Sequence, residues 1–190
     1  METIAHLLTK PEISHFIREA AGEVFATMLA MELVPGVTRV GRTAADQHAG
    51  IIVTLGLTGA RRGTGQLLFE PALACRAASA MLMAEYTKVD DDVIDAIAET
   101  ANMVIGNIKN HLETRLGPMG LSTPAVVYGG EFETRTAGDP EWVIVPFQCG
   151  ADTVIVQLML TDHPSGPPRR AWNAAVRSGA QHENGARLSS

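Results

Sequence analysis

The chain has 190 residues, of which 46% are hydrophobic, and a formal net charge of −6. This apolar content is enough to build one folded domain with a substantial core. The negative charge argues against nucleic acid and anionic membranes as the main partners, because both bind clusters of cationic side chains.

The cysteines and the apolar segments narrow the class of protein further. Cys75 and Cys149 lie far apart and show no CxxC or histidine spacing, so we expect reduced core residues and no metal site. The longest apolar stretch, residues 24–34, is too short to span a membrane and contains Glu32. No signal-sequence pattern is present at the N-terminus, and the sequence therefore predicts a cytoplasmic protein.

The first half of the chain predicts a helix, a hairpin and a second helix. In residues 11–31 apolar side chains recur every three or four positions, and a proline and a glutamate lie in the first turn. Two short apolar runs, 51–57 and 65–69, flank a glycine-bounded turn and indicate a β-hairpin. A shorter helix is expected from residue 71 to about residue 84. The methionines expected to fill the core in these helices are Met28, Met31, Met81 and Met83.

A long helix is predicted from about residue 90 to residue 116. Three consecutive aspartates, Asp90 to Asp92, place negative charge where the helix dipole favours it, and Gly117 with Pro118 ends the periodic pattern. Three strands are expected after it, in residues 124–134, 142–147 and 153–161.

Long helices combined with an antiparallel-rich sheet predict an α+β architecture in two layers. Residues 163–190 are rich in proline, glycine, serine and arginine and have no sustained periodicity. We therefore expect one domain over residues 1–162, followed by a disordered tail over residues 163–190.

The long helix has two opposite faces at about 100° per residue. The first is an apolar stripe that should face the core, formed by Val93, Ile97, Ala101, Val104, Ile108 and Leu112. The second is a band about 60° wide almost opposite the stripe. This band holds Asp95, Glu99, Asn102 and Gly106.

The spacing of the second face leaves two interpretations open. A solvent-facing surface collects acidic and amide side chains by chance, which would make the band structural. However, Glu99 and Asn102 lie one turn apart and could contact a second molecule together. Asparagine is also a poor helix former in a helix interior, which favours a functional reason for its presence.

The residues of this band carry a family resemblance. The segment from Asp95 through Glu99 and Asn102 to Gly106, followed by Pro124 after twenty-one intervening residues from Asn102, resembles the signature of the CheC/CheX phosphatases of bacterial chemotaxis. The similarity extends over residues 123–129 and covers residues 90–162 well, and residues 11–89 through the order of elements. The first helix lacks an asparagine three residues after either glutamate, which favours the CheX-like subgroup with one active motif.

The resemblance implies a fold, an activity and a set of partners. The fold is the CheC/CheX-like two-layer domain, and the activity is hydrolysis of the aspartyl phosphate of a CheY-like response regulator. Glu99 and Asn102 are implied as catalytic residues, with Glu99 on the receiver's lysine and Asn102 orienting the attacking water. Asp95, Gly106 and Pro124 are implied as partner-binding or supporting residues.

The resemblance further implies no cofactor of the protein's own, since the phosphorylated receiver supplies Mg²⁺, and a homodimer formed by strand exchange. The alternative that remains is a non-catalytic module that docks on a receiver or on the flagellar switch.

Overall fold

The computed structural model describes residues 8–41, 48–132 and 141–161. In these ranges the helices are α1 (Lys10–Met28), α2 (Pro71–Leu82) and α3 (Asp91–Leu116). The strands are β1 (Val34–Pro35), β2 (Arg39–Gly41), β3 (His48–Gly59), β4 (Gly63–Phe69), β5 (Met119–Leu121), β6 (Ala125–Phe132), β7 (Trp142–Cys149) and β8 (Asp152–Leu160).

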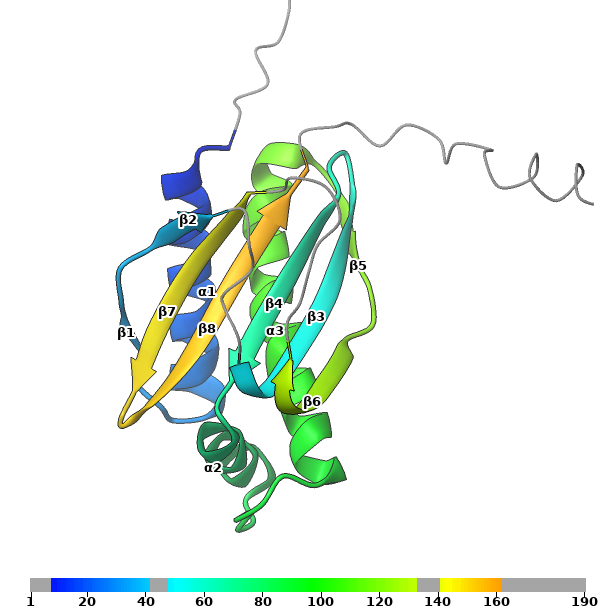
Figure 1. The fold of residues 1–190 in the computed structure, drawn as a ribbon. Coiled ribbons are helices and arrows are strands. Elements are labelled where there is room, and N and C mark those ends of the chain that lie inside the picture. Colours follow the sequence, from blue (N-terminus) through cyan, green and yellow to red (C-terminus); the bar gives the residue numbers. More distant parts are fainter. Residues whose placement is uncertain (1–7, 42–47, 133–140, 162–190) are drawn as a thin grey trace, which may run out of the picture.

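The strands form one antiparallel sheet in the order β1-β7-β8-β4-β3-β5, with β2 also paired to β7 and β6 also paired to β3. Figure 1 shows α1 and α3 side by side on one face of this sheet and α2 at one of its ends. The predicted two-layer α+β architecture is confirmed.

Helix α1 begins as predicted but ends three residues early. Thr9 and Glu12 form a reciprocal capping box at its N-terminus. At the other end Ala30 adopts a φ of 51°, and the Met31 N–H donates to the Phe25 carbonyl at 2.9 Å. A backbone with positive φ cannot continue a right-handed helix, so the prediction that the helix reaches residue 31 is wrong.

Helix α3 matches its predicted bounds because both ends carry strong local signals. The Asp90 carboxylate accepts a hydrogen bond from the Val93 N–H at 3.1 Å. Gly117 follows the last turn with a φ of 77°, a conformation that glycine adopts readily. The six side chains of the predicted apolar stripe are all buried, which confirms the orientation of the helix.

The main strands were predicted, whereas three short ones were missed. The hairpin of β3 and β4 and the later strands β6, β7 and β8 are present. Of the strand predicted over residues 124–134, residues 133 and 134 lie outside the described residues. The missed strands, β1, β2 and β5, are two or three residues long. A segment of that length is too short to show an alternating pattern.

The expectations for sulfur-containing side chains had mixed outcomes. Cys75 and Cys149 are free and buried, as expected. Met31 and Met81 pack against the core, but Met28 is 50% exposed and Met83 is 92% exposed. The prediction that all four methionines fill the core is therefore wrong for two of them.

No helix in the described part of the chain is long and apolar enough to cross a membrane. The predicted tail, residues 163–190, lies outside the described residues.

Helix α3 packs closely on the sheet where it crosses β4. A Cβ atom added to Gly65 of β4 would lie only 2.6 Å from Ile105 Cδ1 and 3.0 Å from Ile105 Cγ2. Ile105 itself is fully buried. The absent side chain of Gly65 thus makes room for Ile105, and this contact determines how closely α3 packs on the sheet.

We predict that Gly65→Ala lowers the free energy of unfolding by about 1–3 kcal/mol, because the new methyl group overlaps Ile105. Ile105→Val removes the clashing Cδ1 atom, so in the double variant part of this loss should be recovered, with a coupling of at least about 0.5 kcal/mol. Urea unfolding of wild type, the two single variants and the double variant measures this coupling as a double-mutant cycle. Strictly additive losses would show that the two residues do not limit the approach of the helix.

Candidate functional site

The predicted band on α3 faces away from the core. Asp95 and Glu99 are exposed, and Asn102 and Gly106 are partly exposed. Within the described part of the chain, the side chains of Asp95, Glu99 and Asn102 have no hydrogen bond or ion pair. Their polar groups are therefore available to a second molecule.

The N-terminal half of α3 is held on one side by α2 and the segment after it. The Thr100 hydroxyl donates to the Ala96 carbonyl at 2.9 Å and lies 3.9 Å from Met81 Sδ of α2. The Tyr86 hydroxyl donates to Asp92 Oδ2 at 3.1 Å. Desolvation raises the pKa of Tyr86, and the bond to Asp92 raises it further, so Tyr86 remains a hydrogen-bond donor at neutral pH.

The C-terminal half of α3 packs against α1. The rings of Phe16 and His111 are stacked with centroids 5.1 Å apart. Asn107 Nδ2 donates to Glu23 Oε2 at 3.4 Å, which links the two helices near their middle. These contacts lie to one side of the band and leave its outer face open.

The end of α3 is tied to β5 through Glu113. Its carboxylate accepts a hydrogen bond from the Met119 N–H at 2.8 Å and forms an ion pair with Lys109 at 2.9 Å. The Met119 N–H, followed by Lys109, holds the pKa of Glu113 below its ordinary value. Glu113 therefore stays ionised at neutral pH and fixes the path of the chain out of the helix.

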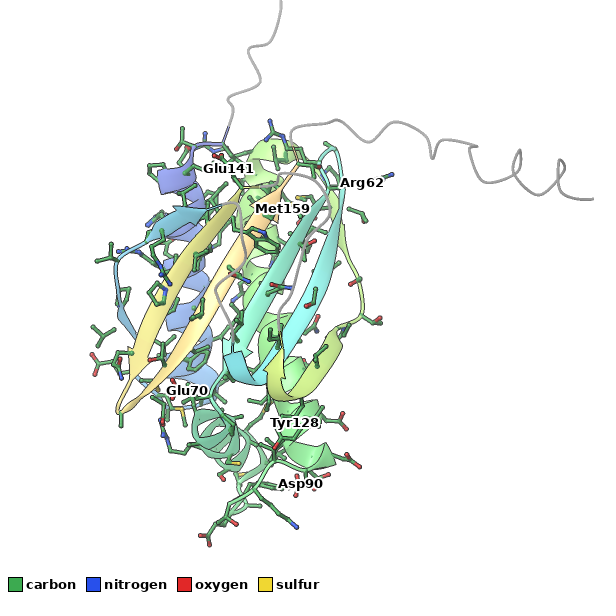
Figure 2. All side chains as sticks on the ribbon, viewed as in Figure 1. Arg62, Glu70, Asp90, Tyr128, Glu141 and Met159 are labelled. Carbon is green, nitrogen blue, oxygen red and sulfur yellow. The ribbon has the colours of Figure 1, made fainter. Side chains whose placement is uncertain are left out.

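Pro124, the remaining predicted residue, lies on the edge of the sheet and brings no polar group to the band. Strands β5 and β6 both pair with β3, and Ser122 joins the interval between them to Gly56 through two hydrogen bonds of 2.9 Å. Proline has no backbone N–H that could pair with β3, so it fits the interval between the two strands, where the pairing is interrupted. From there β6 runs beside α3, and Figure 2 shows Tyr128 of β6 at the same end of the molecule as Asp90.

The glutamates of α1 are engaged within the chain, unlike Glu99. Glu19 Oε2 lies 3.3 Å from His15 Nε2, and Glu23 accepts the bond from Asn107. Gly22 and Ala26 occupy the positions three residues after these glutamates. Helix α1 thus has no counterpart of the Glu99 and Asn102 pair.

Gly106 has no internal reason to be a glycine. In a helix interior glycine costs about 0.5–1 kcal/mol relative to alanine. A Cβ built on Gly106 would meet no atom of the described residues within 4 Å, so packing in this part of the chain does not require a glycine there. Gly106 lies one turn from Asn102 and lines an open space between α1 and α3.

The arrangement can position and stabilise a group, but it does not enclose one. Side chains at positions i and i+3 of a helix have Cβ atoms about 5–6 Å apart, so Glu99 and Asn102 can contact one partner simultaneously. They project from a convex helix surface, which suits a macromolecular partner that carries its own pocket. Among the described residues, no group of three or more histidine, cysteine, aspartate or glutamate side chains could hold a metal ion.

Comparison with known proteins gives a family and several solved structures of similar fold. The sequence profile of the family described as "Chemotaxis phosphatase CheX" matches residues 51–148. A CheC-like superfamily protein from Shewanella sp. PV-4 has 25% identity and a TM-score of 0.71, covering 78% of this chain and 97% of that one. The chemotaxis protein CheX of Desulfovibrio desulfuricans has 22% identity and a TM-score of 0.71, covering 79% and 99%.

A third structure with the same fold is a complex of CheX with CheY, BeF3 and Mg²⁺ from Borrelia burgdorferi. It has 24% identity and a TM-score of 0.66, and the match covers 79% of this chain and 98% of that one. No curated protein sequence matches the chain at a significant level. The profile match spans more than half of the chain, and the chain therefore belongs to the CheX family of chemotaxis phosphatases.

Proposed function

We propose that this protein accelerates hydrolysis of the aspartyl phosphate of a CheY-like receiver domain, with Asn102 and Glu99 as its catalytic residues. The observation that carries the proposal is the exposed Glu99 and Asn102 pair, which no described residue engages, on a chain of the CheX family. A receiver as partner is supported by the Borrelia burgdorferi protein of the same fold, which forms a complex with CheY.

Asn102 orients the attacking water. Its carboxamide can accept one hydrogen bond from the water and donate another, and it does not titrate. The water oxygen forms a bond to phosphorus while the bond to the aspartyl oxygen breaks, which releases inorganic phosphate and the receiver's free carboxylate. Such a reaction depends mainly on positioning and on stabilisation of charge, and both can come from a single well-placed amide.

Glu99 sets the register of docking through a lysine of the receiver. A charge-assisted bond of this kind contributes about 1.5–3 kcal/mol when it is removed from water. The receiver's own acidic residues hold Mg²⁺ on its phosphoryl group, so this chain supplies no metal ligand in the proposal. Asp95 adds negative charge beside Glu99, and Pro124 orders the strand that runs next to the helix.

A homodimer formed by strand exchange is also part of the proposal. Exposed apolar side chains in and between the outer strands on both sides of the sheet support it. On one side these are Val34, Val37 and Val40, and on the other Val127 and Tyr128.

The first test is loss of phosphate from a panel of the host's phosphorylated receivers, with wild type and Asn102→Ala in parallel. We expect wild type to accelerate hydrolysis for at least one receiver and the variant to lose at least about 100-fold of that acceleration. The variant should be as stable as wild type or more stable by up to about 0.7 kcal/mol, since alanine is the better helix former. Urea unfolding provides this control.

Retained acceleration in the stable Asn102→Ala variant would rule out the assigned role. Binding of a receiver without acceleration by wild type would instead favour the alternative function, a non-catalytic docking module for a receiver or for the flagellar switch.

A second test separates docking from chemistry. Glu99→Gln keeps the shape of the side chain and removes its charge, so the KM for the phosphorylated receiver should rise about tenfold or more while kcat changes little. Asp91→Asn is the matched control, because it removes one exposed charge from the same helix; its effect on KM should stay below about twofold. Equal effects of the two variants would indicate general charge attraction and not a specific contact.

A further inference from the structure

An open groove of about 280 Å³ lies between α1 and α3, directly beside the band. Its apolar lining comes from Val24 and Met28 of α1 and from Met103 of α3, and Gly106 forms part of its wall. Met103 follows Asn102 in the sequence, and Gly106 lies one turn further along the helix. The groove and the catalytic pair therefore form one continuous surface.

The charged side chains of the groove already have neighbours. Lys109 is paired with Glu113 at 2.9 Å, and Glu23 accepts the hydrogen bond from Asn107 at 3.4 Å. The Lys109 and Glu113 pair lies within α3, and the bond between Asn107 and Glu23 joins α3 to α1, so an ion entering the groove would compete with partners that these side chains already have. The groove thus favours an uncharged group over a charged one, and Val24, Met28 and Met103 offer it an apolar surface. The uncharged polar side chains of the lining are Thr27, Asn107 and Asn110.

Two features prepare the groove for such a group. Met28 is 50% exposed, and the methionine side chains on both walls can adapt to the shape of what enters. Gly106, one turn from Asn102, leaves space in the wall of the groove, although no contact with a described residue requires a glycine there. A partner that approaches the helix surface closely would explain both features.

We propose that this groove receives an apolar side chain of the phosphorylated receiver, one that lies beside its aspartyl phosphate, and that this contact selects which receiver is bound. The inference rests on the proposed function, since the groove is an extension of the Glu99 and Asn102 surface. It assigns a docking role to α1, the helix that has no catalytic pair of its own.

The test compares Gly106→Ala with Gly22→Ala. Gly22 is a matched control because it lies in the interior of α1, a Cβ on it also meets nothing within 4 Å, and it is not part of the groove. Both variants replace a helical glycine by alanine, so both should raise Tm by about 2–5 °C. The assay measures kcat and KM for the receiver that the phosphatase panel identifies.

We expect Gly106→Ala to raise KM at least about tenfold, because the methyl group occupies space needed by the receiver, with a change in kcat below about twofold. Gly22→Ala should leave both constants unchanged. A variant that is more stable yet binds its substrate less well cannot be explained by damage to the fold.

A second variant, Met28→Gln, tests the wall of the groove that α1 forms. It keeps the length of the side chain and adds a polar amide, so KM should rise while Tm stays close to that of wild type.

If Gly106→Ala and Met28→Gln leave KM unchanged while Asn102→Ala abolishes turnover, the groove does not bind the receiver and the proposed function stands. If Asn102→Ala retains full turnover, the proposed function itself fails. A rise in KM for Gly22→Ala equal to that for Gly106→Ala would also overturn the role of the groove.

Discussion

The close packing of Ile105 against Gly65 is the constraint on which the functional surface depends. It leaves no room for a side chain between α3 and β4, and the buried apolar stripe of α3 sets the rotation of the helix about its axis. No described residue forms a hydrogen bond or ion pair with the side chains of Glu99 and Asn102, so their direction follows from the burial of the opposite side of α3. A shift of α3 by a fraction of a turn would rotate the pair out of register with any partner. The core and the active surface are therefore two sides of a single packing arrangement.

The structure could be predicted from the sequence where it depends on neighbouring residues in the chain. Asp90 and Gly117 mark the ends of α3, and the periodicity between them determines which side is buried, so the position of Asn102 could be predicted from the sequence alone. The end of α1 could not be predicted from the sequence, because Ala30 adopts a positive φ without being a glycine. The exposure of Met28 was also missed, since an apolar residue at the end of an amphipathic helix is usually buried.

The candidate site, too, could be predicted from the sequence only in part. A carboxylate and an amide one turn apart do not by themselves distinguish a catalytic surface from a solvated one, and only the resemblance, which includes the distant Pro124, favoured the first. The groove beside the pair lies outside what any single segment can predict, because α1 and α3 each contribute one wall and more than sixty residues separate them in the chain. Asn107 and Glu23, which join the two walls, show no recognisable spacing in the sequence.

The two sides of the sheet differ in a way that bears on self-association. On one side β7 is covered by β1 and β2, which are only two and three residues long and include a proline, so they offer few backbone groups for another strand to pair with. On the other side β6 is eight residues long and pairs only with β3 among the described strands. Among the described strands this leaves β6 as the one long open edge, and a sheet with one such edge can pair with a second copy around a two-fold axis but cannot add further copies end to end. The short strands on the β7 side thus protect the sheet against open-ended fibre growth.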